Sequence, residues 1–164
     1  MEYEVVRGSV VNANADVIVN AANINLYAGG GVCGAIFDAA GRDELQRECN
    51  MIGYCETGNA VITKGYNLQA KYIIHAVGPV YSGSEDDGIL LASTYKNSLL
   101  LADKYNLESI AFPCISTGIY GFPLVEASKI AISVVKNYKP INNLKKVYFY
   151  CFTDKEYEAY LKNK

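Results

Sequence analysis

The stretch Ala21–Gly41 reads AANINLYAGGGVCGAIFDAAG, and it places three consecutive glycines between an asparagine-bearing segment and the expected first turn of a helix. The preceding run VIVNAA (17–22) is nearly continuous in apolar or small residues, as expected of a central strand covered on both faces by helices. A strand, a glycine loop and a helix in this order predict an α/β fold. The glycines let a ligand approach the backbone closely, although a turn that needs positive φ also favours them.

The rest of the chain continues this alternation of strands and helices. Runs of β-branched and aromatic residues predict strands at Tyr3–Val10, Asp16–Ala22, Asn59–Thr63, Lys71–Ala76, Ser109–Ile115 and Lys146–Phe152. Apolar residues at helical spacing predict helices at Val32–Ala40, Asp43–Met51, Gly88–Tyr105, Pro123–Tyr138 and Lys155–Lys162. No repeat or linker-like stretch interrupts the pattern. We therefore expect one domain, residues 1–164, with helices on both faces of its sheet.

Charge and composition exclude several classes of protein. The net charge of −2 and the pI of about 5.4 leave no basic surface for a nucleic-acid backbone. The N-terminal residues lack the pattern of a signal peptide, and no apolar run reaches the roughly 20 residues of a membrane helix. The five cysteines form no CxxC pair, which suits free thiols in a reducing compartment. We expect a cytoplasmic protein with neither a membrane nor a nucleic-acid partner.

A second glycine-rich loop, STGIYG (116–121), follows the apolar run IAFPCI (110–115). Loops that follow parallel strands meet at the carboxyl edge of the sheet, so the two glycine loops predict two walls around a pyrophosphate. Arginine occurs only at Arg7, Arg42 and Arg47, so backbone N–H groups must supply most phosphate contacts. Residues 29–34, GGGVCG, fit the letters of a GxGxxG fingerprint but do not directly follow the predicted strand, and no P-loop with its Lys occurs, which argues against a dinucleotide oxidoreductase and an NTPase.

Four motifs in this order resemble the macrodomain family of ADP-ribose-binding modules, and its MacroD-type branch in particular. They are VIVNAAN (17–23), GGGVCGAI (29–36), KGYNLQAKYIIHAVGPV (64–80) and IAFPCISTGIYGFP (110–123). The resemblance covers essentially the whole chain. It implies a three-layer α/β/α sandwich with a mixed, mostly parallel six-stranded sheet. It also implies that ADP-ribose lies between the two glycine loops.

The resemblance assigns a role to individual residues. The adenine would be read at Ser9 and Val10, where relatives carry an Asp-Ile pair, and Phe152 would pack on the ring, although an aromatic at a strand end is also typical of core filling. The substrate-binding residues of the first loop would be Ala22, Asn23, Gly29, Gly30, Gly31 and Val32. Those of the second loop would be Ser116, Thr117, Gly118, Ile119 and Tyr120, with Tyr120 over the distal ribose.

The resemblance also points to catalytic residues near the distal ribose. Asn23 would hold the ribose hydroxyls beside the bond that hydrolytic members cut, whereas Asn20 is interpreted as structural. Cys33 stands where those members carry an aspartate in GGGVDG. Two interpretations of Cys33 remain open. Either a thiolate, favoured at a helix N-terminus, orients or deprotonates water, or the thiol is a small filler and a ligand phosphate organises the water.

The expected function is therefore hydrolysis. The resemblance implies release of ADP-ribose from mono-ADP-ribosylated Asp or Glu side chains of proteins, deacetylation of O-acetyl-ADP-ribose, or both. A noncatalytic ADP-ribose reader is the alternative, and a generic nucleotide-binding Rossmann protein is a third hypothesis. We expect a monomer without cofactor or metal. The only histidine, His75, lies in the apolar run YIIHAV (72–77) with no ligand spacing around it, which favours a structural role.

Overall fold

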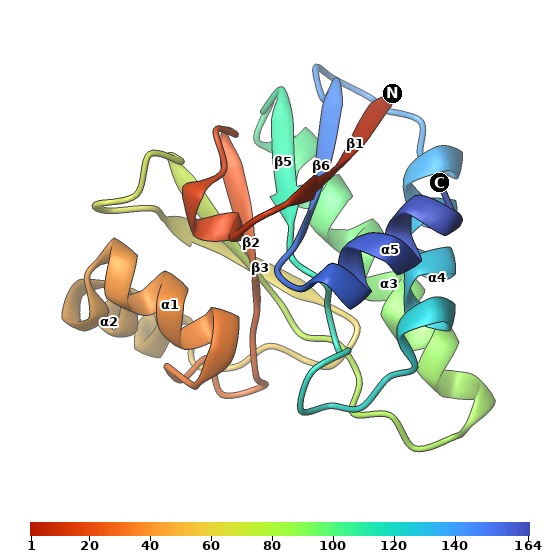
Figure 1. Cartoon of the computed structure of the whole chain (residues 1–164). Helices are drawn as coiled ribbons and strands as arrows, with labels where there is room; N and C mark the ends of the chain where they lie inside the picture. The colour runs from red at the N-terminus through yellow and green to blue at the C-terminus, as the bar shows by residue number, and fades with distance from the viewer.

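Six strands form one mixed sheet in the order β1-β6-β5-β2-β4-β3 in a computed structural model that describes all residues, 1–164 (Figure 1). The strands are β1 (Glu2–Arg7), β2 (Val17–Ala21), β3 (Ala60–Lys64), β4 (Tyr72–Ala76), β5 (Ser109–Phe112) and β6 (Lys146–Cys151). Every neighbouring pair is parallel except β3 and β4. The predicted mixed, mostly parallel sheet is confirmed.

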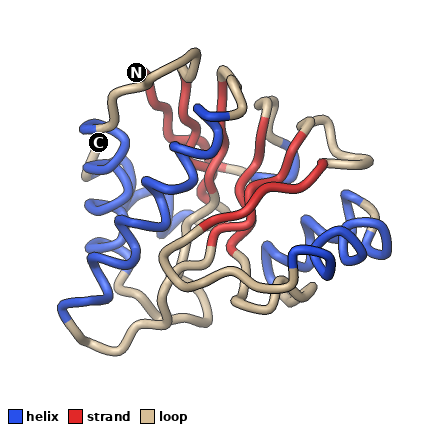
Figure 2. The backbone as a smooth tube through the Cα atoms, turned by 180° about the vertical axis from the view of Figure 1, so that it is seen from behind, coloured by secondary structure: helices blue, strands red, loops and turns tan.

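Helices cover both faces of this sheet (Figures 1 and 2). The first pair, α1 (Gly31–Ala40) and α2 (Arg42–Ile52), lies on one side, and the other side holds α3 (Glu85–Lys104), α4 (Leu124–Asn137) and α5 (Asp154–Lys162). A short 3-10 helix, η1 (Val10–Asn12), follows β1. None of these helices has the length and apolarity needed to cross a membrane. The predicted three-layer sandwich is confirmed.

The central strand β2 shows why the chain needs helices on both sides. Val17, Ile18 and Val19 are all buried, and alternate side chains of a strand point to opposite faces. Val17 and Val19 accordingly belong to one hydrophobic core, and Ile18 belongs to the other. A strand with apolar residues at successive positions is stable only where both of its faces are covered.

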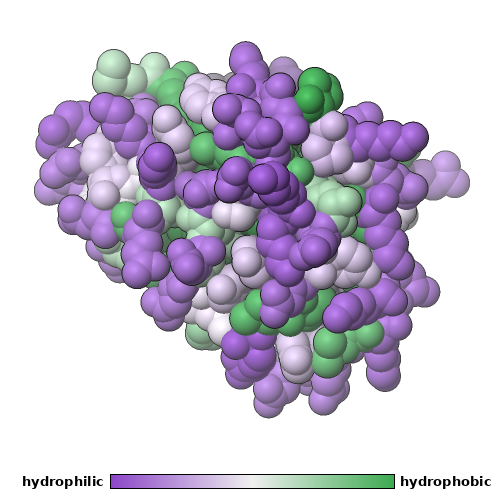
Figure 3. Space-filling model, turned by 90° about the horizontal axis from the view of Figure 1, so that it is seen from above, coloured by the Kyte–Doolittle hydropathy of each residue, from purple (hydrophilic) through white to green (hydrophobic).

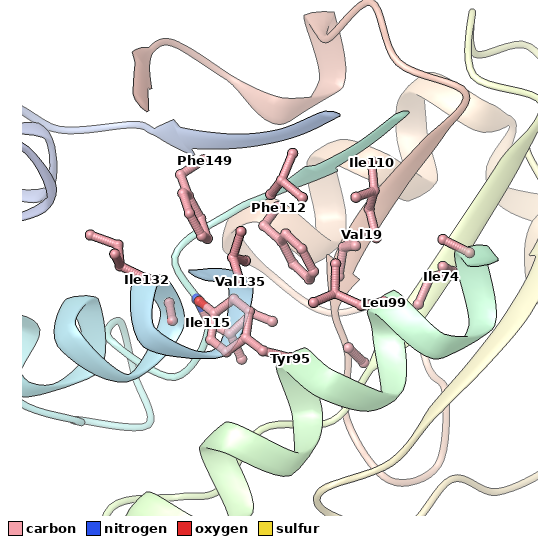
Figure 4. Close-up of a cluster of buried hydrophobic side chains, with 14 of the residues drawn as sticks. Val19, Ile74, Tyr95, Leu99, Ile110, Phe112, Ile115, Ile132, Val135 and Phe149 are labelled. Carbon is pink, nitrogen blue, oxygen red and sulfur yellow. The ribbon is translucent and has the colours of Figure 1, made fainter. Parts of the chain in front are cut away.

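The larger core lies between the sheet and the three C-terminal helices, and Figure 4 shows its centre. Phe112 of β5 and Phe149 of β6 stack with ring centroids 6.0 Å apart. The ring centroid of Tyr95 in α3 lies 5.0 Å from that of Phe112. The Tyr95 hydroxyl accepts a hydrogen bond from the backbone N–H of Ile115 at 3.2 Å. The core therefore holds the chain just before the second glycine loop.

Two predicted strands run three residues too far at their carboxyl ends. β1 ends at Arg7 rather than at Val10, because the Ser9 hydroxyl accepts from Val11 N and turns the chain into η1. β5 ends at Phe112 rather than at Ile115, because Pro113 has no N–H to continue the ladder. The first correction moves the predicted site residues Ser9 and Val10 out of the strand.

The loops that follow the parallel strands lie together at one end of the sheet (Figure 1). In Figure 1 the parallel strands β2 and β5 run downward, so the loops that follow them lie at the bottom. Figure 3 shows the molecule from above, where hydrophilic residues cover most of the surface and hydrophobic ones form scattered spots. The loops at the carboxyl ends of the strands, where ligands of α/β proteins bind, are therefore the place to look for a site.

Candidate ADP-ribose site

A cavity of about 530 Å³ opens at the carboxyl ends of the parallel strands. Its walls are the turn after β1, the two glycine-rich loops after β2 and β5, and the chain between β6 and α5. The residues that line it are Gly8, Ser9, Val10, Ala21, Ala22, Asn23, Gly29, Gly30, Gly31, Val32, Cys33, Ala35, Gly78, Pro113, Cys114, Ile115, Ser116, Gly118, Ile119, Tyr120, Tyr150, Phe152, Thr153 and Glu156. This volume is within the range of small-molecule sites.

Side-chain hydrogen bonds to the backbone hold the chain that leads into the first glycine-rich loop. The Asn23 side chain donates to Tyr27 O at 2.8 Å and accepts from Tyr27 N at 3.0 Å. Gln46 of α2 then accepts from Ala28 N and donates to Leu26 O. These contacts hold residues 23–28 in place, and this segment leads directly into the three glycines that line the cavity.

The glycines of this loop have two different reasons to be glycine. Gly31 has φ +56°, where other residues are strained. A Cβ at Gly34 would lie 2.5 Å from Gly29 O, so the first turn of α1 packs directly on the loop. The first backbone bond of α1 runs from Gly34 N to Gly30 O. The N–H groups of the first three helical residues, 31–33, therefore have no partner in the chain.

Most backbone N–H groups of the second loop also have no hydrogen-bond partner in the chain. Its closing bonds run from Phe122 N to Ser116 O and from Gly121 N to Gly118 O. None of the N–H groups of residues 117–120 donates to another group of the chain. Backbone N–H groups without partners on two facing loops form an anion-binding arrangement.

Ser116 and Gly78 meet beneath the second loop. Ser116 has φ +68° and is buried, and its hydroxyl has no hydrogen-bond partner in the chain. A Cβ at Gly78 would lie 2.3 Å from that hydroxyl oxygen and 2.5 Å from Ile115 Cγ2. Any larger residue at position 78 would therefore push this loop out of place.

The far end of the cavity lies beside β1 and β6. Phe152 follows β6 there with its side chain 68% exposed, so the core-filling interpretation of this aromatic is wrong. Ser9 is half-buried, and its hydroxyl already accepts from Val11 N at 3.4 Å. Glu156 of α5 accepts from Phe152 N at 2.8 Å and from Thr153 N at 3.0 Å. The exposed ring of Phe152, the hydroxyl of Ser9 and the carboxylate of Glu156 thus line the same end of the cavity.

A buried polar chain connects Cys33 to the middle of the sheet. Asn20 Nδ2 donates to His75 Nδ1 at 3.0 Å and contacts Cys33 Sγ at 3.6 Å. On the other side of the ring, His75 Nε2 lies 2.9 Å from the Thr63 hydroxyl oxygen, and that hydroxyl donates to Lys64 O. His75 Nε2 must therefore carry the proton and Nδ1 must accept. The structural role predicted for Asn20 agrees with its complete burial.

This chain predicts a pH dependence of stability. Burial lowers the pKa of His75 to about 3. Between this value and the unfolded pKa, His75 is therefore protonated in the unfolded chain and neutral in the folded protein. Stability is then highest above the unfolded pKa of about 6.5 and falls as the pH decreases towards 3. Between pH 7.5 and 4.5 we expect His75 to lower the free energy of unfolding by about 2 to 3 kcal/mol.

Urea unfolding of the wild type and of a His75→Asn variant over this pH range measures the effect. The variant should have a lower stability at pH 7.5 but a flatter pH profile, because it lacks the titrating group. The carboxylates are common to both proteins, so the difference between the two profiles isolates His75. Parallel profiles would show that folding does not lower the pKa of His75.

Cys33 is the third residue of α1 and is 7% exposed. Its thiol donates to Tyr27 O at 3.7 Å and receives the contact from Asn20. Tyr27 O also accepts from Asn23, so one carbonyl joins the two predicted catalytic residues. These contacts direct the S–H group into the protein's own loop.

The structure brings almost all of the predicted site residues to this cavity. Every predicted substrate-binding residue lines it except Thr117, whose hydroxyl donates back to Cys114 O at 3.5 Å. The Thr117 hydroxyl thus contacts its own loop, whereas its backbone N–H has no partner in the chain. The site assignment itself stays a prediction.

The lining residues that sequence reasoning missed are Gly8, Ala21, Ala35, Gly78, residues 113–115, Tyr150, Thr153 and Glu156. Gly78 and residues 113–115 lie within two of the four quoted motifs, but the resemblance assigned them no role. Thr153 and Glu156 form the capping box of α5, and the pattern TDKE at residues 153–156 is a recognisable sign of it. The capping box could have drawn attention to Glu156.

Comparisons with known proteins agree on one family. The model of the family described as Macro domain matches residues 19–131. A macro domain-containing protein of Caldanaerobacter subterraneus is 49% identical over 98% of this chain and 94% of its own length. Another, from Methanosarcina mazei, is 52% identical over 88% of this chain and 78% of its own length.

Solved structures show the same similarity in three dimensions. A mutant of the Oceanobacillus iheyensis macrodomain with ADPR has a TM-score of 0.93 and 38% identity, covering 98% of this chain and 90% of that protein. The Trypanosoma brucei macrodomain in complex with ADP-ribose has a TM-score of 0.87 and 40% identity, covering 98% of this chain and 68% of that protein.

Proposed function

This chain belongs to the macro domain family, and on that premise we propose that it binds ADP-ribose in the cavity between its two glycine-rich loops. We extend the domain to residues 1–164, because β1 and β6 lie outside the matched residues 19–131 yet pair within the same sheet. We further propose that the protein acts as a monomer on mono-ADP-ribosylated proteins. The MacroD-type branch and the cytoplasmic location stay predictions.

One observation carries this proposal. Two glycine-rich loops face each other across the cavity with backbone N–H groups that have no partner in the chain. Such groups bind phosphate without cationic side chains, and none of the lining residues is basic. A diphosphate between the loops would direct the adenosine towards Phe152 and the distal ribose towards Asn23.

The proposed reaction is hydrolysis of an ester. The water oxygen bonds to a carbon of the ester that joins the distal ribose to an Asp or Glu side chain, and the ester C–O bond at that carbon breaks. The leaving oxygen takes a proton from the water, and the products are free ADP-ribose and a restored carboxyl group. The same chemistry releases acetate from O-acetyl-ADP-ribose. Holding the ribose and the water in one geometry supplies most of the rate when no strong base is present. Asn23 is proposed to hold the ribose, and Cys33 lies beside it.

Binding is the first test. We expect free ADP-ribose to bind with micromolar affinity, about −8 kcal/mol, because backbone phosphate contacts and burial of the adenine both contribute. Isothermal titration calorimetry measures this affinity directly. The absence of heat and of a thermal shift at millimolar ADP-ribose would contradict the proposal.

A noncatalytic reader remains the second candidate, and one observation favours it. The only carboxylate among the lining residues is Glu156 at the adenosine end, and Cys33 stands at the ribose end where an acid would act. Turnover separates the two candidates. A transferase auto-modified on acidic residues should lose its label when a hydrolase is added, whereas a reader would bind the modified protein and leave the label in place.

A further inference from the structure

Glu156 is the only charged residue that lines the cavity. Its Oε1 accepts from Phe152 N at 2.8 Å and from Thr153 N at 3.0 Å, and the Thr153 hydroxyl accepts from Glu156 N at 3.2 Å. These reciprocal bonds are the capping box of α5. The carboxylate is therefore held in one position at the helix N-terminus, and Oε2 has no hydrogen-bond partner in the chain.

No cation neutralises this carboxylate. Arg7, at the end of β1, pairs with Asp154 at 3.0 Å and is not among the residues that line the cavity. The other lining side chains at this end, such as Ser9, Tyr150 and Phe152, are uncharged. The adenosine end of the cavity consequently carries one negative charge at a fixed position. This charge repels anions, whereas the backbone N–H groups of the two glycine-rich loops attract them.

We propose that Glu156 is a specificity-determining residue, which accepts hydrogen bonds from neutral groups of the adenosine and excludes ligands with an additional phosphate on the adenosine ribose. This inference rests on the proposed binding of ADP-ribose. A free carboxylate oxygen accepts from hydroxyl or amino groups. A second anion brought beside it would be repelled, and like charges placed together at an interface suppress binding.

Calorimetry with two probes tests the inference. ADP-ribose and its analogue with a 2′-phosphate on the adenosine ribose are titrated into the wild type and into Glu156→Gln. Glutamine keeps an oxygen for the capping box but removes the charge. The wild type should prefer ADP-ribose by roughly 10- to 100-fold, and Glu156→Gln should lower this preference to about threefold or less.

Glu158→Gln is the matched control, because Glu158 is an exposed acid of the same helix and does not line the cavity. It should leave the preference unchanged. Should Glu156→Gln fail to fold, the salt dependence of the wild type supplies the test, since raising the salt concentration screens a charge-based preference and should reduce it.

The outcomes separate this inference from the proposed function. Failure of the wild type to bind ADP-ribose overturns both. Binding of ADP-ribose with equal affinity for the phosphorylated analogue overturns the inference alone. So does a preference that Glu156→Gln and high salt leave unchanged, because the discrimination would then depend on shape and not on charge.

Discussion

Gly118→Glu is expected to raise the dissociation constant for ADP-ribose at least about 1000-fold while the fold stays intact. The reason is that it places a carboxylate in the second glycine-rich loop. Gly118 lines the cavity, and a Cβ built on it meets no atom within 4 Å. The Cβ of the new side chain therefore meets no clash within the protein. Its carboxylate would occupy the space of the diphosphate and repel it. Calorimetry measures the affinity, and thermal unfolding monitors the fold.

Gly118→Ala is the matched control. It adds a Cβ to the same backbone without charge and should change the dissociation constant by no more than about threefold, because the position is open and its φ is not in the left-handed region. A folded Gly118→Glu protein with unchanged affinity would refute this placement of the diphosphate. An equal loss in both variants would point to the loop's flexibility as the cause.

The two glycine loops were predictable because local sequence determines them. A buried strand leads into GGG and another into STGIYG, and parallel strands bring such loops together at one edge of a sheet. Sheet order, in contrast, was not predicted, because the resemblance implied only a mixed, mostly parallel sheet of six strands. The strand pattern alone does not say that β1 and β6 lie side by side at one edge.

Side-chain directions within the loops were not predictable. The sequence predicts Asn23 as a ribose contact but not the two hydrogen bonds that its amide makes with the backbone of Tyr27. Thr117 turns away from the cavity, because the chain reverses at Ser116 in a left-handed conformation that serine rarely adopts. Such local hydrogen bonds and unusual φ values leave no periodic trace in a sequence.

The buried chain of Asn20, His75 and Thr63 was also beyond sequence reasoning. Its members come from β2, β4 and β3, which neighbour one another in the sheet. Each appears in the sequence only as one polar residue in an apolar strand, and burial of a polar group is tolerated where a partner exists. The partner becomes visible only when the register pairs Asn20 with His75.

Asn23→Ala lowers any hydrolase turnover by about 100-fold or more, whereas Cys33→Ala retains it within about threefold. The Asn23 amide closes the loop that delivers the glycines, through two hydrogen bonds to Tyr27, and it lies where the distal ribose is proposed to bind. Cys33 contributes one weak thiol contact to the same carbonyl. Release of label from an acid-linked ADP-ribosylated protein measures both rates, and calorimetry with ADP-ribose reports binding separately.

Cys33→Asp distinguishes the two roles left open for the thiol. If the thiol is a filler and a ligand phosphate organises the water, an aspartate adds a hydrogen-bond acceptor beside Asn20 Nδ2 and should match or raise the rate. If a thiolate orients or deprotonates the water instead, Cys33→Ala must stop turnover while ADP-ribose still binds, and alkylation of the wild type must do the same. The contacts of Cys33 favour the first result, because its S–H group donates to Tyr27 O within the loop. A thiol that must release its proton to water would have to break that contact first.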